Sequence, residues 1–237
     1  MEGPGTWAER SAWAAAQFDA ADLGDRRRTR RRVRWATQRA GNRSASLPQQ
    51  TGHAADRKAA YRWFAEQDVT HAAICDPHFA QTRAAACRRP LVFLVQDTTE
   101  LNFSNPVHGA GLGPMGRGEK ERWGLHQQNV LAVDPQTRRP LGWLHQPHHR
   151  WTKRGRDHDR GAQRRVPLKE RASHGWVQAI EAIGQPPDGV RWVHVGDRGE
   201  DLFGAYQAAR RQGCDGLIRA SSDRYVQTVG GERKRFG

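Results

Sequence analysis

Apolar residues recur at helical spacing through the first ninety positions of the chain. Intervals of three and four residues between large apolar side chains predict amphipathic helices, and Asp25 and Gly41 are typical of the start and end of one of them. A new helix start is expected at Asp76-Pro77, where aspartate caps and proline takes the first helical position. The segment SASLPQQTG is expected to be a loop. The predicted helices cover residues 7–18, 26–40, 56–66 and 70–88.

After residue 90 the pattern changes to short apolar runs that end in turn residues. These runs predict strands, with two late amphipathic helices and a basic loop over residues 150–166. Three successive strands followed by helical crossovers is the ribonuclease-H-like order, whose first and fourth strands are parallel neighbours. The sequence therefore predicts an α/β protein, with a helical basic domain over 1–90 and a mixed-sheet domain over 91–237. Strands are expected at 91–97, 125–134, 139–146, 191–197 and 216–220, and the two helices at 168–183 and 201–212.

The net charge of the chain indicates what kind of partner it binds. The 237 residues contain 39 Lys and Arg against 25 Asp and Glu, for a net charge of +14 and an isoelectric point near 11.0. Arginine dominates, and its planar guanidinium suits phosphates and base edges. A GC-rich genome also raises arginine content, but it does not by itself produce this excess of cations. A polyanion is the expected partner.

The arginines are densest in the predicted helix over residues 26–40, and no acid occurs between positions 26 and 43. Such a run is often a solvated helix face. Here all the charge has one sign, so neighbouring turns repel each other, and bound phosphates would relieve that repulsion. We therefore expect nucleic-acid contact along this helix. Its arginines are Arg26, Arg27, Arg28, Arg30, Arg31, Arg32, Arg34 and Arg39.

Other classes of protein are disfavoured. The three cysteines form no C-x-x-C pair, which argues against a disulfide framework or a zinc site. No run of 18 apolar residues exists, and the first residues, MEGPGTWAER, do not form a signal peptide. Histidines 145, 148 and 149 lack the spacing of a metal site. A soluble, intracellular protein is expected.

Two aspartates follow apolar runs: Asp97 ends the predicted first strand and Asp197 the fourth. If these strands are parallel neighbours, their ends lie about 5 Å apart. Two carboxylates so close repel each other unless a cation lies between them, and Mg²⁺ suits this oxygen set. Metal ions at such a site support displacement at a phosphodiester. The alternative is that each aspartate is only a turn-former or a helix cap.

Several segments together resemble bacterial DDE cut-and-paste transposases of the insertion-sequence-four family, the group that includes the transposon-five transposase. The most specific are ADLGDRRRTRR and QDTTEL. The others, in the family's order, are AAYRWF, RWGLHQQNVLAV, PLGWLHQ, VGDRGEDLF and LIRASSDR. The resemblance implies a helical domain that binds transposon ends, then a ribonuclease-H-like core with strand order 3-2-1-4-5, in a protein of the bacterial cytoplasm and nucleoid.

The resemblance also assigns roles to residues. Asp97 and Asp197 would be catalytic acids and ligands of Mg²⁺, with Mn²⁺ as a substitute. The partners would be double-stranded DNA, as transposon ends and target, and a second copy in a homodimer. The implied reaction is water attack on a transposon-end phosphodiester, followed by attack of the freed 3′-hydroxyl on target DNA. The implied DNA-binding residues are Arg27, Arg28, Arg31, Arg219 and Arg224.

Two departures from the family pattern concern the catalytic acids. Gly199 stands where the family has Glu in its Asp-Arg-Glu-Ala-Asp motif. The third catalytic acid, a Glu within Tyr-x-x-Arg-x-x-x-Glu, has no counterpart, because Glu232 lacks the required Tyr and Arg. Glu200 and Asp201 could lend an oxygen to the site. We therefore expect an N-terminal portion of a transposase, truncated or inactive, which binds DNA, binds metal weakly and lacks the family's dimerisation region.

Three alternatives stay open at this stage. The chain could be a regulator that occupies transposon ends or inhibits a full-length transposase. It could be a basic metal-dependent nuclease whose site is completed by Glu200, or a nucleic-acid-binding module without chemistry. Loss of Mn²⁺-dependent nicking in Asp97→Ala would favour the nuclease.

Overall fold

The computed structural model describes residues 5–103, 111–115, 122–150 and 174–236. The chain divides into two compact units, Met1–Gln81 and Thr82–Gly237, and each is described by itself. None of the helices in the described ranges combines the length and the apolar character needed to cross a membrane. The mixed α/β class, with helices first and a mixed sheet after them, is confirmed.

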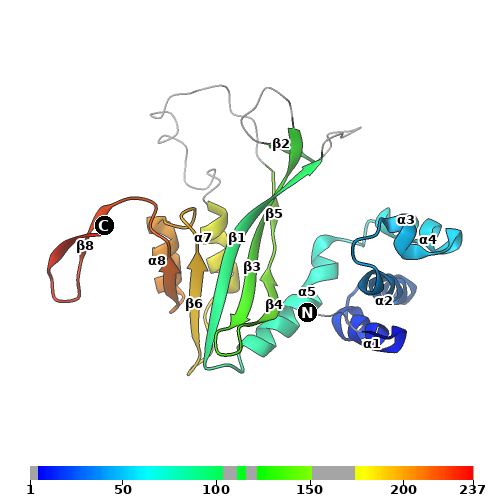
Figure 1. Ribbon diagram of the computed structural model, residues 1–237, viewed down its shortest axis with the longest axis horizontal. Coiled ribbons are helices and arrows are strands. Elements are labelled where there is room, and N and C mark those ends of the chain that lie inside the picture. The colour runs from blue at the N-terminus through cyan, green and yellow to red at the C-terminus, as the bar shows by residue number, and fades with distance from the viewer. Residues whose placement is uncertain (1–4, 104–110, 116–121, 151–173, 237) are drawn as a thin grey trace. The chain divides into compact units, whose positions relative to one another are not determined.

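Helices form the first unit (Figure 1). Helix α2 begins where the sequence predicts, because the Asp25 carboxylate accepts a hydrogen bond from the Arg27 N–H at 2.7 Å and satisfies one free donor of the first turn. The buried centre consists of Ala21, Leu23 and Trp63. The helices are α1 (Trp7–Phe18), α2 (Arg26–Gly41), α3 (Leu47–Thr51), α4 (Ala54–Phe64) and α5 (His71–Ala86), the last extending into the second unit.

Two predictions about these helices are wrong. The expected loop SASLPQQTG contains α3, which Ser46 starts by donating its N–H to the Gln49 side chain at 3.0 Å, with Pro48 in the first turn. The expected new helix start at Asp76-Pro77 is absent, because α5 continues through Pro77. A helix can accommodate an internal proline by giving up one backbone hydrogen bond when its other contacts are sufficient.

The second unit is built on a sheet in which strands follow the order β2-β3-β1-β6-β7, with β4 and β5 also pairing with β3. Strands β1, β6 and β7 are parallel to one another, whereas β3 is antiparallel to β1 and to β4. The strands are β1 (Leu91–Phe103), β2 (Gly113–Met115), β3 (Arg122–Asp134), β4 (Arg139–His145), β5 (His148–His149), β6 (Arg191–Gly196) and β7 (Asp215–Ile218). The other elements are α7 (His174–Ile183), α8 (Phe203–Arg211) and a hairpin of β8 (Arg224–Gln227) and β9 (Arg233–Phe236).

Strand β1 is longer than predicted and does not end at Asp97. Its antiparallel pairing with β3 continues to Phe103 opposite Trp123. Its parallel pairing with β6, in contrast, ends at Val95 opposite Val195. The polar residues that begin at Gln96 therefore mark the place where β1 stops pairing with β6. The strand stays extended beyond that place because it still pairs with β3.

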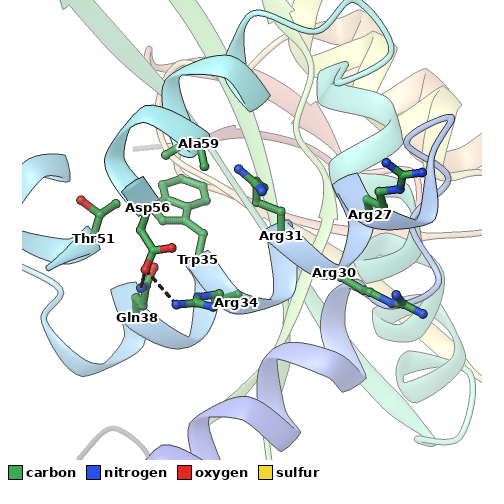
Figure 2. Close-up of a pocket in the computed structure, with 10 residues that line it drawn as sticks. Arg27, Arg30, Arg31, Arg34, Trp35, Gln38, Thr51, Asp56 and Ala59 are labelled. Carbon is green, nitrogen blue, oxygen red and sulfur yellow. Dashed lines mark hydrogen bonds and ion pairs between the residues drawn. The ribbon is translucent and has the colours of Figure 1, made fainter. Parts of the chain in front are cut away.

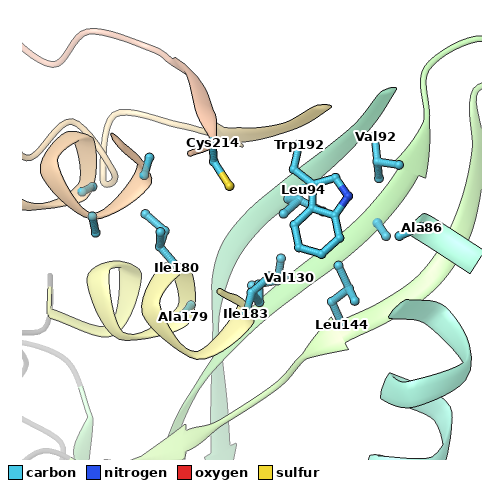
Figure 3. Packing of buried hydrophobic residues seen from close by; sticks show 14 of the residues in the cluster. Ala86, Val92, Leu94, Val130, Leu144, Ala179, Ile180, Ile183, Trp192 and Cys214 are labelled. Carbon is cyan, nitrogen blue, oxygen red and sulfur yellow. The ribbon is translucent and has the colours of Figure 1, made fainter. Parts of the chain in front are cut away.

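The main core lies between this sheet and helices α7 and α8 (Figure 3). Alternate residues of β1 and β6, including Val92, Leu94 and Trp192, are fully buried against Ile180 of α7. Strand residues two apart face the same side, so this alternation defines the covered face of the sheet. Apart from Arg150, the expected basic loop over 150–166 lies outside the described residues, as does the start of the helix expected from residue 168.

Candidate nucleic-acid interface and carboxylate site

Helix α2 displays most of its arginines to solvent. Its buried positions are Thr29, Ala36 and Thr37, all small, and they let the helix pack closely against the rest of the first unit. Arg28 and Arg32 are only partly exposed, whereas the other six arginines of the helix are exposed. The exposed ones are Arg26, Arg27, Arg30, Arg31, Arg34 and Arg39.

Two arginines of α2 are neutralised, although the sequence predicted an uncompensated run. Arg28 forms ion pairs with Glu66, at 2.7 Å, and with Asp68, and these pairs raise the pKa of its guanidinium. Arg34 pairs with Asp56 at 3.0 Å. These acids come from α4 and the segment after it, so the correction arises from tertiary contacts. Within the described ranges, no acid pairs with Arg27 or Arg31.

A shallow groove of about 360 Å³ runs along the exposed side of α2 (Figure 2). Arg27, Arg31 and Arg34 border it from α2, and Trp35 lies beneath Ala59 of α4. Guanidinium groups beside an aromatic ring are suited to phosphate oxygens and to the faces of bases. Its residues are Arg27, Arg30, Arg31, Arg34, Trp35, Gln38, Thr51, Asp56, Ala59 and Ala60.

Arg32 differs from its neighbours because it is turned inward. Its guanidinium lies 3.9 Å from the centre of the Phe18 ring and 5.1 Å from that of Trp35. Burial lowers the pKa of Arg32 to about 10. This arginine therefore stabilises the aromatic interior of the unit by cation–π contact and is not available to a ligand.

The two aspartates lie at the same end of the parallel strand pair. Asp97 in β1 and Asp197 after β6 both stand two residues beyond the last parallel pair, Val95 opposite Val195. Both side chains are exposed. One oxygen of each accepts a local backbone N–H at 2.7 Å, from Thr98 for Asp97 and from Gly199 for Asp197. The carboxylate of Asp97 is thus oriented by the backbone of its own strand, and that of Asp197 by the turn after β6.

A buried polar network lies directly behind these aspartates. The Gln96 amide group donates to Glu200 Oε1 at 3.1 Å and lies 2.9 Å from His194 Nδ1. Gln128 of β3 donates in turn to Gln96 Oε1 at 3.4 Å and accepts from the Thr98 hydroxyl at 2.5 Å. The exposed fractions of Gln96, Gln128, His194 and Glu200 are 3%, 1%, 0% and 0%.

Burial changes the charge states inside this network. It lowers the pKa of His194 to about 4, so the imidazole is neutral at pH 7. It raises the pKa of Glu200 to about 8, with a smaller contribution from the negative charge of Asp197. In the metal-free protein, Glu200 is therefore largely protonated at neutral pH.

The network was not predicted from the sequence, apart from the suggestion that Glu200 could lend an oxygen. One signal was present: Gln96 occupies the same face of β1 as Val92 and Leu94, where an apolar residue is expected. A glutamine on the buried face of a strand requires hydrogen-bond partners, and His194 and Glu200 supply them.

The other predicted DNA-binding arginines lie in the second unit. Arg219 follows β7, is exposed, and donates its backbone N–H to the Gly196 carbonyl at 3.1 Å, so it lies at the same end of the sheet as Asp197. Arg224 forms an ion pair with the buried carboxylate of Asp201, which also accepts from the Ser221 N–H at 2.6 Å. The guanidinium of Arg224 thus has an internal role in joining β8 to the turn after β6.

The donor set at the strand ends fits a hard divalent cation. Carboxylate oxygens are preferred ligands of Mg²⁺, which keeps several waters and needs few protein groups. Within the residues that the structure describes, no three His, Cys, Asp or Glu side chains form a group that could hold a metal ion. The carboxylates that the described strand ends offer to such a cation are those of Asp97 and Asp197.

Comparison with known families agrees with the basic helical unit. Residues 10–69 match the family model described as "Transposase DNA-binding". The matched segment contains α2, α3 and α4 and therefore the whole arginine groove. This match supports a transposase-like DNA-binding protein.

The comparison with solved structures found a similar transposase structure, at a low TM-score. The chain is similar to the protein in "Mos1 transposase paired-end complex with left transposon end", at 10% sequence identity and a TM-score of 0.23. The similarity covers 91% of this chain and 74% of that chain. At this TM-score it carries no argument about fold or function.

Proposed function

We propose that this chain is a DNA transposition protein of the insertion-sequence-four type. In this proposal α2 binds transposon-end DNA, and Asp97 and Asp197 supply two of the three acids of metal-dependent phosphodiester cleavage and strand transfer. The observation that carries it is the transposase DNA-binding match over 10–69 together with the exposed arginine groove in that segment.

The groove supports duplex DNA as the partner. Arg27, Arg30 and Arg31 are exposed on one helix within a single turn, and Arg26 adds charge to its first turn. Arginine contacts with phosphates release counterions from DNA and supply most of the sequence-independent affinity. Trp35 beside them offers an apolar surface for a sugar or a base.

The sheet supports the proposed chemistry. The order β4-β3-β1-β6-β7, with β1 and β6 parallel, is the one expected of a ribonuclease-H-like core. Ligands of open α/β sheets bind at the carboxyl ends of parallel strands, and Asp97 and Asp197 lie there. In the absence of a third ligand among the described residues, we expect weak Mg²⁺ or Mn²⁺ binding and no complete transposition.

DNA binding can be tested with the purified chain and a fluorescent duplex. Anisotropy titrations between 50 and 200 mM salt should give a logarithm of affinity that falls linearly with the logarithm of salt concentration. Selection from randomised duplexes should enrich one sequence, as expected for end recognition. Absence of salt-dependent binding, or equal binding of all duplexes and of RNA, would contradict the proposal.

The chemistry is tested separately with Mn²⁺ and supercoiled plasmid. We expect DNA binding without strand cleavage, and Asp97→Ala should bind DNA as well as the unmodified chain does. Nicking of any plasmid that Asp97→Ala abolishes would instead show a complete nuclease site. That result would favour the nuclease alternative over a transposition protein.

A further inference from the structure

The buried network behind the two aspartates connects the backbone segments that hold them. Gln96 immediately precedes Asp97, and Glu200 closes the turn that begins at Asp197. The turn itself is defined by the Glu200 N–H, which donates to the Asp197 carbonyl at 3.2 Å. A hydrogen bond between Gln96 and Glu200 therefore joins the segment of the first aspartate to the turn of the second.

This connection is needed because the strands no longer hold each other at that level. Parallel pairing of β1 with β6 stops at Val95 opposite Val195, two residues short of the aspartates. Beyond that point, the Gln96–Glu200 hydrogen bond is a side-chain link that takes over from the strand pairing. In a buried site such a bond has little competition from water.

The fit around Glu200 is close. A Cβ added at Gly196 would lie 1.7 Å from Glu200 Oε2 and 2.7 Å from its Cβ, which is closer than atoms can approach. Gly196 thus leaves the space into which the Glu200 side chain folds. Glu200 Oε2 and His194 Nε2 are buried and have no hydrogen-bond partner in the described structure.

We infer that Glu200 is a positioning residue, whose hydrogen bond with Gln96 holds the turn of Asp197 in register with Asp97. The inference rests on the proposed function of the two aspartates as a divalent-cation site. Glu200 itself does not touch the cation. Its role requires an acceptor oxygen at the position of Oε1, which an amide supplies as well as a carboxyl group does.

The test measures Mn²⁺ affinity through the electron paramagnetic resonance signal of free Mn²⁺, at pH 7 and without DNA. Glu200→Gln keeps an acceptor for Gln96 and should bind Mn²⁺ within about twofold of the unmodified chain. Glu200→Met keeps the length of the side chain without the acceptor and should bind at least tenfold more weakly. Gln96→Met removes the donor from the other side and should have the same effect, so the test does not depend on one variant folding.

Two controls separate this effect from loss of charge and from unfolding. Glu181→Met removes an exposed carboxylate of α7 and should leave Mn²⁺ affinity unchanged. Circular dichroism and DNA binding should be the same for every variant. Gly196→Ala, which displaces the Glu200 side chain without altering it, should reproduce the loss seen in Glu200→Met.

The possible results are distinguishable. Mn²⁺ binding that is lost in Asp97→Ala and Asp197→Ala but kept in Glu200→Met would overturn the inference and leave the proposed function intact. An equal loss in Glu200→Gln and Glu200→Met would show that the carboxylate is itself a ligand, which also overturns a positioning role. Mn²⁺ affinity that is unchanged in both Asp97→Ala and Asp197→Ala would overturn the proposed cation site, and the inference with it.

Discussion

The arginines of α2 divide into a set that faces solvent and a set held by internal contacts, and this division can be measured on DNA. Arg27 and Arg31 are exposed, border the groove, and pair with no acid in the described part of the chain. The double variant Arg27→Gln, Arg31→Gln keeps a polar side chain of similar helix propensity and removes two charges. It should therefore weaken DNA binding without unfolding the helix.

The expected magnitude follows from counterion release. Each phosphate contact contributes about 0.9 to the slope of log affinity against log salt, so losing two contacts lowers the slope by about 1.8. Relative to 1 M salt, where this electrostatic contribution vanishes, a slope change of about 1.8 lowers the logarithm of the affinity at 0.1 M by about 1.8. This is a roughly 60-fold loss of affinity. Since phosphate contacts carry no sequence information, the loss should be similar for all duplexes.

The assay is fluorescence anisotropy at several salt concentrations, with a matched variant in the other unit. Arg138→Gln with Arg139→Gln removes the same two charges from the exposed β3–β4 turn. It should leave the slope almost unchanged. If both double variants reduced affinity equally, the effect would be one of net charge, and the assignment of the interface to α2 would be wrong.

Three further predictions concern folding. Asp25→Ala removes the cap of α2 and should lower the free energy of unfolding by about 1 kcal/mol in a urea titration. Ile180→Ala, in the fully buried core, should lower it by about 2–5 kcal/mol, and a smaller loss would mean that the core collapses around the gap. In metal-free buffer, stability should fall from pH 6.5 to 8 by at most about 1.4 kcal/mol per unit, because folded Glu200, with its raised pKa, still holds a proton there that the unfolded chain has already released; Glu200→Gln should remove this slope. Below pH 6.5 the lowered pKa of His194 has the opposite effect, because the unfolded chain takes up a proton there that folded His194 does not, and stability falls as the pH falls. The range from pH 6.5 to 8 therefore reports on Glu200 without this contribution.

The helix of arginines could be predicted because its signals are local. Asp25 at the start, Gly41 at the end and apolar residues at helical spacing act within a few residues of one another, and α2 has these bounds almost unchanged. The same holds for the strands, whose apolar runs begin close to where β1, β3, β4 and β6 begin. The mixed α/β class follows from the order of these elements.

The charge of the interface depended on tertiary structure. The sequence shows a run of arginines without an acid, but Glu66 and Asp68 reach back to Arg28 from 38 and 40 residues away. Asp56 does the same to Arg34. Composition gives the total charge, whereas pairing over these distances decides which arginines stay available to DNA.

The carboxylate site shows the same division between local and distant effects. The sequence alone determines that Asp97 and Asp197 follow apolar runs and that the chain carries a net charge of +14. The pairing of β1 with β3 decides how far β1 continues past Asp97. The position of the turn after β6 depends on the contacts of Gln96 with His194 and Glu200, which are 98 and 104 residues away in the sequence. The physical reason is range: periodicity and capping act over a few residues, whereas strand partners and buried hydrogen bonds exist only once distant segments have packed together.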